Sequence, residues 1–302
     1  MRFGGHETFP IREGWLRKGL VLLQSDPDKV TDEYAADWLG VGRNMAKSIR
    51  HWLVATGLAT HNDDDSKKSK ELCITRLGGL LLEQDPYFVE PGTWWILHIN
   101  LVNNPKYAAS WNWFFNSLSL DRFDRATCMN GLHRYLKTTE ARKPSPKTLE
   151  RDLACLLSTY SRPIPNDYRD PEETYLCPFS QLGIMSYFRA SKYYQVHRGE
   201  KAIPSQVFCY ALSLAFLNSR DGGNVKAYDA IHMPNAPGRV FALNSEALFE
   251  MLHRFADGKA ENVLKLTGLA GERVISIGRK EPHEWIAEYY QSLKGAPNRH
   301  VA

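Results

Sequence analysis

A glycine turn between two helical segments constrains the fold of this chain more than any other feature. A helix is expected from Trp15 to Gln24, and a second apolar repeat at helical spacing ends at Gly40-Val41-Gly42. Thr31 is expected to be the N-cap of that second helix, because its hydroxyl can accept a hydrogen bond from the first turn. A third helix is expected from Arg43 to about Thr56. A short helix, a tight turn and a second helix are typical of the helix-turn-helix motif.

The helix after the turn has two distinct faces. Its apolar face is formed by Met45, Ala46, Ile49, Trp52 and Leu53. Its polar face carries side chains that can reach phosphates and base edges, namely Arg43, Asn44, Lys47, Ser48, Arg50 and His51. The pattern therefore favours DNA contact by this helix. A solvated surface, or a module that binds proteins, is the alternative.

The next residues fit a wing. Leu58–Thr60 and Leu72–Thr75 are expected to be strands, and a helix is expected from Arg76. The polar loop between the strands carries three basic residues that are candidate DNA contacts, Lys67, Lys68 and Lys70. Three consecutive aspartates at 63–65 bring the charge of this loop near zero, which weakens it as a phosphate contact. Residues 1–85 are thus predicted to form a winged helix-turn-helix domain.

The remainder of the chain is expected to be mainly α. Residues 86–160 are predicted to form a helical domain and residues 161–302 a helical C-terminal domain, with a second winged helix as an option there. The middle region is rich in aromatic residues that are expected to form core rather than a base-stacking platform, namely Trp94, Trp95, Trp111, Trp113, Phe114, Phe115 and Phe123.

A second basic stretch flanks the middle helix. Lys143, Lys147 and Arg151 are candidate DNA contacts at the start of a helix that reaches Tyr160. A linker followed by a solvated helix start explains the same residues equally well. Residues 187–201 mix aromatic and basic side chains, for which an amphipathic helix is favoured over a surface for single-stranded nucleic acid.

The C-terminal region carries several local signals. Helices are expected over Ser205–Asn218, Val225–Ile231 and Pro282–Leu293. Val240–Leu243 has the composition of a strand, and Asn244 is expected to cap a helix that runs to about Ala256.

Composition and cysteine usage restrict the class of protein. The chain has 302 residues, a net charge of +4 and a sequence pI of about 8.7, so charge alone does not argue for nucleic acid. Its five cysteines are widely spaced and form no CxxC pair, so neither a zinc site nor a disulfide framework is expected. No signal peptide and no apolar run of membrane-spanning length are evident. We expect a cytoplasmic protein with no membrane partner.

Familiar catalytic signatures are missing, and one string remains as a candidate. GxxxxGK[ST], GxGxxG and GxSxG do not occur, and Pro10 breaks an HExxH match. The N-terminal string places His6, Glu7 and Arg12 in one loop shaped by glycine and proline. His6 as a general base and Glu7 as an acid or metal ligand is one interpretation. The other is a capping segment in which Arg12 pairs with an acid, and the residues alone favour it. The acidic residues at 167–173 are a second candidate for a metal.

The N-terminal string also resembles a known family. Phe3, His6-Glu7-Thr8-Phe9 and Arg12-Glu13-Gly14-Trp15 are similar to the opening of a bacterial family of unknown-function domain proteins. That family includes SspB, the DNA-nicking component of the Ssp single-strand DNA phosphorothioation system. The strings at 148–152 and 178–183 resemble later landmarks of the family, so the likeness covers most of the chain.

The resemblance implies a function and partners. It implies a DNA-binding component of a phosphorothioation and anti-phage defence system that nicks DNA with Mg²⁺ or Mn²⁺. The implied partners are DNA, an ATP pyrophosphatase-type sulfur-transfer enzyme and a cysteine desulfurase, and a homodimer is an option. Within this interpretation His6, Glu7 and Arg12 are the candidate catalytic residues. A non-enzymatic winged-helix regulator and a protein-protein adaptor are the alternatives.

Overall fold

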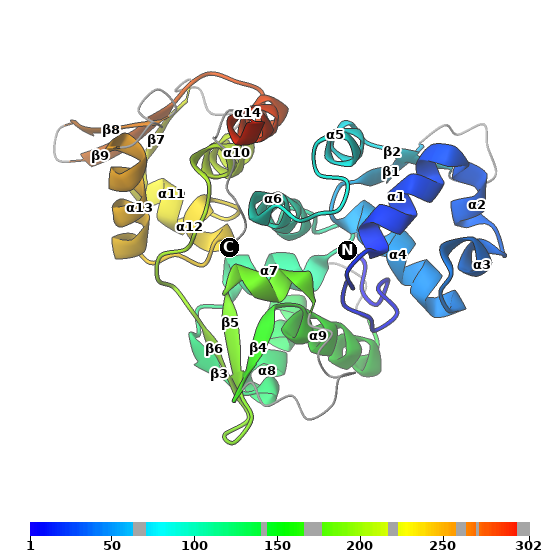
Figure 1. Ribbon diagram of the computed structural model, residues 1–302. Helices are drawn as coiled ribbons and strands as arrows, with labels where there is room; N and C mark the ends of the chain where they lie inside the picture. Colours follow the sequence, from blue (N-terminus) through cyan, green and yellow to red (C-terminus); the bar gives the residue numbers. More distant parts are fainter. Residues whose placement is uncertain are drawn as a thin grey trace. The chain divides into compact units, whose positions relative to one another are not determined.

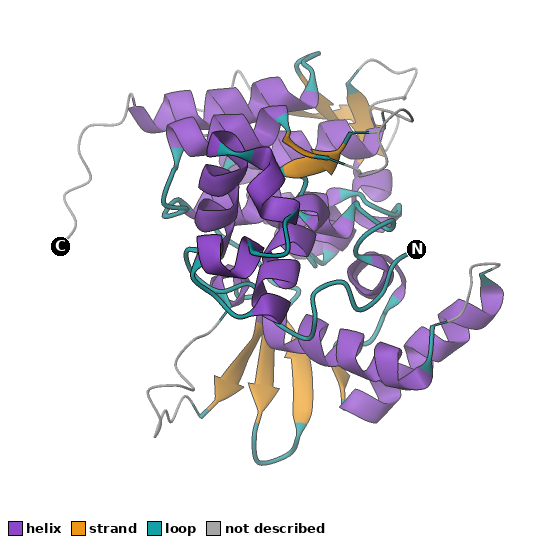
Figure 2. Ribbon diagram, turned by 90° about the vertical axis from the view of Figure 1, so that its right-hand side faces the viewer, coloured by secondary structure: helices purple, strands orange, loops and turns teal. Residues whose placement is uncertain are grey.

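The fold is mostly helical with a few small sheets (Figures 1 and 2). The structure, a computed structural model, describes residues 1–62, 71–139, 144–165, 177–216, 223–257, 264–269 and 272–294. The chain divides into two compact units, Met1–His197 and Arg198–Ala302. Within the described residues, no helix combines the length and the apolar character needed to cross a membrane.

The N-terminal part of unit 1 contains the predicted helix pair and the two strands. Its elements are α1 (Trp15–Ser25), α2 (Pro27–Thr31), α3 (Ala35–Leu39), α4 (Arg43–Ala55), β1 (Ala59–His61), β2 (Leu72–Ile74) and α5 (Arg76–Gln84). The helices from Trp15, Arg43 and Arg76 begin where the sequence predicts. Thr31 is the last residue of α2 and caps nothing, so that prediction is wrong. Pro27 at the first position of α2 explains the difference, because proline suits a helix start.

Local contacts fix the strand pair after α4. β1 and β2 are antiparallel, with Thr60 opposite Cys73. The Thr75 hydroxyl accepts a hydrogen bond from the Gly78 amide and caps α5. A Cβ at Gly78 would lie 2.3 Å from the Leu58 carbonyl oxygen, so only glycine allows this approach of α5 to the residue before β1. Lys67, Lys68 and Lys70 of the predicted wing lie outside the described residues.

The rest of unit 1 surrounds an aromatic core. Its elements are α6 (Pro91–Val102), α7 (Ala109–Ser117), β3 (Arg122–Phe123), α8 (Arg125–Thr138), α9 (Pro146–Tyr160), β4 (Ser161–Ile164), the 3₁₀ helix η2 (Pro178–Leu182), β5 (Met185–Phe188) and β6 (Tyr193–Val196). Nearly every residue of α6 is buried, as expected for a helix enclosed on all sides. All seven aromatic residues predicted as core are buried, which confirms that prediction.

The mixed aromatic and basic stretch is a hairpin, not the helix that we predicted. β5 and β6 pair antiparallel within a sheet of order β3-β6-β5-β4. Tyr187 lies opposite Tyr194, and their ring centroids are 4.7 Å apart. Lys192 adopts a positive φ of 56° in the turn. Cross-strand aromatic pairs stabilise a sheet and here outweigh the helical spacing of the same residues.

Unit 2 packs helices beside a three-stranded sheet. Its elements are α10 (Ser205–Phe216), β7 (Asn224–Lys226), α11 (Ala227–His232), α12 (Pro237–Val240), α13 (Ser245–Asp257), β8 (Leu264–Leu269), β9 (Glu272–Ile277) and α14 (Pro282–Lys294). The strand order is β7-β9-β8, and both pairs are antiparallel. The predicted helix at Val225 begins instead as β7. Val240 ends α12, so the predicted strand at 240–243 is also wrong. Asn244 caps α13 through its side chain, as expected.

Candidate functional site

The N-terminal loop, residues 1–14, folds back onto the body of unit 1. Gly4 has a φ of 72°, and two residues that are not glycine follow it in the same left-handed region: Glu7 at 49° and Thr8 at 73°. Such a conformation costs free energy in a side-chain-bearing residue and is concentrated at functional sites. The loop therefore holds the half-buried Glu7 in a geometry that the surrounding contacts must enforce.

A buried hydrogen-bond network anchors this loop to α9. Asp152 Oδ1 accepts from the Gly4 amide at 2.6 Å and lies 2.8 Å from His6 Nε2, and Asp152 Oδ2 accepts from the Ser110 hydroxyl. His6 and Asp152 are almost completely buried. The opening string and the string at 148–152, which both resemble family landmarks, thus meet at Asp152.

The hydrogen bonds of His6 determine its tautomer. His6 Nδ1 accepts from the Thr8 amide, so the ring proton lies on Nε2 and is donated to Asp152. Both ring nitrogens are engaged, and neither has a lone pair directed at solvent. His6 is therefore placed as a residue that positions the loop, and the interpretation of His6 as a general base lacks geometric support.

The loop also covers part of α4. The Phe9 carbonyl oxygen accepts from Trp52 Nε1 at 3.0 Å and from the Ser48 hydroxyl at 3.4 Å. Gly5 lies directly on the His51 ring. Ser48 and His51 are consequently buried, with 0% and 6% exposure. The expectation that both side chains lie on the accessible polar face of α4 is therefore wrong, because the loop covers that part of the helix.

Replacing Gly5 with alanine is expected to destabilise the protein by about 1–3 kcal/mol, the usual cost of overpacking. A Cβ at Gly5 would lie 2.4 Å from His51 Nδ1, and the buried His51 ring has little room to move. Urea denaturation of Gly5→Ala measures this. Gly79→Ala is the matched control, because a Cβ at Gly79 in α5 meets nothing within 4 Å. Equal stability of the two variants would contradict the close approach.

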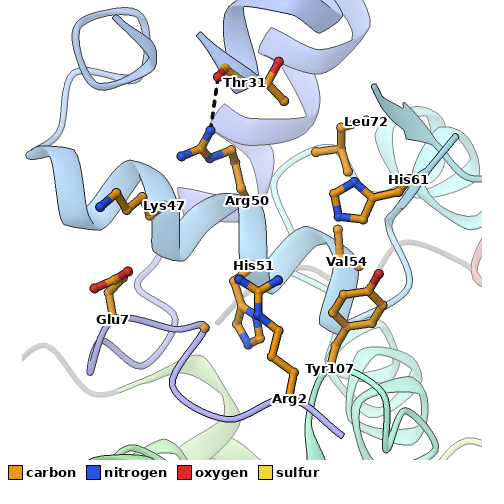
Figure 3. Close-up of a pocket in the computed structure, with 11 residues that line it drawn as sticks. Arg2, Glu7, Thr31, Lys47, Arg50, His51, Val54, His61, Leu72 and Tyr107 are labelled. Carbon is orange, nitrogen blue, oxygen red and sulfur yellow. Dashed lines mark hydrogen bonds between the residues drawn. The ribbon is translucent and has the colours of Figure 1, made fainter. Parts of the chain in front are cut away.

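Between the loop, α4 and β1 lies a pocket of about 280 Å³ (Figure 3). It is lined by Arg2, Gly5, Glu7, Thr31, Lys47, Arg50, His51, Val54, His61, Leu72 and Tyr107. Three of these residues carry a positive charge, and Glu7 is the one acid among those described. The Arg50 guanidinium donates to the Thr31 carbonyl at 3.4 Å, and partial burial lowers the pKa of Arg50. The excess of positive charge suits an anion.

His51 is the unusual residue of this pocket. Both of its ring nitrogens are buried and have no hydrogen-bond partner among the described residues. Burial first, and then the nearby His6 and Arg2, lower the pKa of His51 to about 3, while Asp152 opposes this shift. A buried polar group without a partner is costly, so His51 is an unfavourable feature of the pocket wall.

The exposed residues of α4 form one stripe. Arg43 and Lys47 are exposed and Arg50 is half-buried. Their spacing of four and three residues places them on one face of the helix. Asn44 is exposed beside them. Lys147 and Arg151 are exposed on the first turns of α9, where Thr148 lies against Gly4. The N-terminal loop therefore contacts both predicted basic helices, and Arg12 lies over the Phe9 and Trp15 rings.

Some candidate residues lie outside the described residues, and some residues of the pocket and its surroundings were not predicted. Lys143 and the acidic residues at 167–173 lie outside the described residues. Arg2, His61 and Tyr107 line the pocket but carry no motif that would have singled them out. Asp152 had a usable signal, since it is an acid at a core position between Leu149 and Leu153 of an amphipathic helix.

Few side chains in the described part of the chain are placed to bind a metal ion. Among the residues that the structure describes, no group of three or more His, Cys, Asp or Glu side chains is placed to hold an ion. Magnesium, however, is commonly held by one or two carboxylates together with phosphate oxygens of the substrate. Glu7 at the pocket can supply one such carboxylate, so the residues fit magnesium only in the presence of a phosphate.

Comparisons with known proteins agree on one family. Two solved structures of SspB, one of them bound to magnesium ion, match with TM-scores of 0.84 and 0.82. Each is 27% identical in sequence, and each match covers 98% of this chain and 90% of the other. No curated protein matches significantly. The model of the family described as protein of unknown function DUF4007 matches residues 3–290. This chain is therefore a member of the DUF4007 family, as the opening string indicates.

Proposed function

We propose that this protein is the DNA-binding component of a DNA phosphorothioation and anti-phage defence system, and that it nicks DNA with the help of a divalent metal. The observation that carries the proposal is the cationic pocket beside Glu7, in a chain similar to SspB over almost its whole length. The known likeness to a magnesium-bound structure supports Mg²⁺ as the metal, with Mn²⁺ as a substitute.

DNA recognition is proposed to use residues 1–85 as a winged helix-turn-helix. α3, the turn at Gly40, α4, the β1–β2 pair and α5 follow one another in the order that this motif requires. Arg43, Asn44, Lys47 and Arg50 are the proposed contacts on α4. Lys147 and Arg151 extend the basic surface through the loop that contacts both helices.

The pocket is proposed to hold the phosphate that is cleaved. Arg2, Lys47 and Arg50 can bind and orient phosphate oxygens through charge-assisted hydrogen bonds. Glu7 would hold the metal together with the phosphate. When bound, the metal supplies polarisation of the phosphate and lowers the pKa of a coordinated water. His6 and Asp152 keep the loop, and therefore Glu7, in place.

Unit 2 is proposed to be a second winged helix with a protein partner. The order α10, β7, α11, α13, β8, β9 and the sheet order β7-β9-β8 suit that fold. Glu246 and Glu250 are exposed on α13 and would repel phosphates. The proposed partners are an ATP pyrophosphatase-type sulfur-transfer enzyme and a cysteine desulfurase, or a second copy of this chain. Size-exclusion chromatography of the mixed proteins tests this, with co-elution expected.

Nicking of supercoiled plasmid tests the enzymatic proposal. We expect open circles with Mg²⁺ or Mn²⁺ and none with EDTA. Glu7→Gln is expected to lower the rate by at least about 100-fold, because the metal loses its protein carboxylate. Glu13→Gln is the matched control, since Glu13 is an exposed acid of the same loop. Equal nicking by both variants would exclude Glu7 as a metal ligand.

A non-enzymatic DNA-binding regulator is the second candidate. The small donor set for a metal among the described residues favours it. Salt-dependent binding of DNA, together with no nicking of plasmid in the presence of any of the metals tested, would support it.

For either function, Lys47→Gln is expected to reduce the slope of log affinity against log salt by about 1, because one phosphate contact is lost. Lys137→Gln, on the exposed last turn of α8, is the control.

A further inference from the structure

The pocket has two chemically different ends (Figure 3). Lys47 and Glu7 lie at one end, and Arg2 and Arg50 lie near the middle beside His51. The other end is formed by His61, Leu72, Val54 and Tyr107. A bare phosphate would use the charged part and leave the aromatic and apolar part without a ligand. The arrangement instead matches a ligand that joins an anionic group to a flat ring.

The aromatic end offers both a ring surface and a polar edge. The His61 and Tyr107 rings have centroids 6.2 Å apart and planes 33° apart. Both residues are half-buried, so part of each ring remains accessible. His61 Nδ1 is buried without a hydrogen-bond partner among the described residues. Nucleobases stack on such rings.

His51 forms the wall at the centre of the pocket. His51 is almost fully buried, and both of its nitrogens have no partner in the described part of the chain. His51 lies between the cationic residues and the aromatic end. A ligand that spans the pocket would therefore pass the His51 ring between its charged part and its aromatic part.

We infer that the pocket takes one unstacked nucleotide of DNA, with its phosphate at Arg2, Lys47 and Arg50 and its base against Tyr107 and His61. The inference rests on the proposed function, since it specifies the form of DNA that the proposed site binds. A nucleotide inside a paired duplex is stacked on both sides and does not present its ring face. The preferred ligand is therefore a strand end, an unpaired nucleotide or a nucleotide extruded from the duplex.

Fluorescence anisotropy on two matched duplexes tests this inference. One duplex is fully paired, and the other has the same sequence with a single unpaired adenine. We expect tighter binding of the second by about 5-fold or more, since stacking of one base on an aromatic side chain contributes about 1–3 kcal/mol. Tyr107→Leu is expected to abolish this preference. His51→Leu is expected to reduce the preference, and Lys137→Gln to leave it intact.

A 2-aminopurine at the unpaired position reports on the base directly. Stacking on Tyr107 is expected to quench its fluorescence on binding, and Tyr107→Leu to remove that quenching. Urea denaturation of each variant distinguishes a binding effect from a folding defect. If both duplexes bind equally and are nicked, the proposed function stands and the inference is overturned. If neither duplex binds, both are overturned.

Discussion

Asp152→Ala is expected to lower the free energy of unfolding by about 3–5 kcal/mol, because a buried donor left without its acceptor costs about 1–3 kcal/mol and three donors lose theirs here. The substitution leaves the Gly4 amide, His6 Nε2 and the Ser110 hydroxyl without their shared acceptor. All three are buried or half-buried, so water replaces the lost carboxylate poorly. The N-terminal loop should detach from α9, and the pocket that the loop helps to form should be lost with it.

Asp152→Asn separates the negative charge from the hydrogen bonds, because it keeps the size of the side chain. The amide oxygen of asparagine can still accept from Gly4 and His6, and the Ser110 hydroxyl can rotate to accept from the amide nitrogen. We therefore expect Asn to cost clearly less than Ala. Urea denaturation measures both, and Asp37→Ala, on the exposed surface of α3, should stay within about 0.5 kcal/mol of the parent protein. A loss below 1 kcal/mol for Asp152→Ala would show that the network contributes little.

Local signals made much of the helical fold predictable. α4, α5, α9 and α13 each begin with a glycine break or a capping side chain and continue with an apolar face. These features act within a few residues, so the sequence alone can reveal them. The secondary-structure prediction failed at 187–201, where the same residues fit both the helical and the strand periodicity. Tyr187 and Tyr194 suit either a helix face or a cross-strand pair, and only the pairing with β3 and β4 decides.

The candidate site was harder to predict because its geometry depends on distant segments. Periodicity places Ser48 and His51 on the polar side of α4, and nothing nearby in sequence says that this side is covered. The cover comes from Gly5 and Phe9, which lie about forty residues earlier in the chain. Because the N-terminal loop folds back in this way, His6 contacts Asp152 and anchors the loop to α9. Gly5 and Glu7 near the opening of the chain line the pocket, and its positive charge comes from Arg2, Lys47 and Arg50.

His51 should make the stability of the protein depend on pH in acid. Its pKa is about 3 in the folded chain and about 6.5 in the unfolded chain, so between these values the unfolded state binds the additional proton. The free energy of unfolding therefore falls as pH decreases, by about 1.4 kcal/mol per pH unit below 6.5 from this residue alone. The groups that face His51 are Arg2, His6 and Asp152, while Glu7, Lys47, Arg50 and His61 line the same pocket.

His51→Leu is expected to remove that contribution. The difference in unfolding free energy between the parent protein and the variant should be constant above about pH 7.5. As the pH falls from 6.5 to 5, the parent should lose about 2 kcal/mol of stability relative to the variant. Urea denaturation across this range measures the difference. Ser48→Ala is the matched control, because Ser48 is buried on the same helix under the same loop and has no titrating side chain. If His51→Leu and Ser48→Ala showed the same dependence on pH, the protonation of His51 would not be what opposes folding in acid.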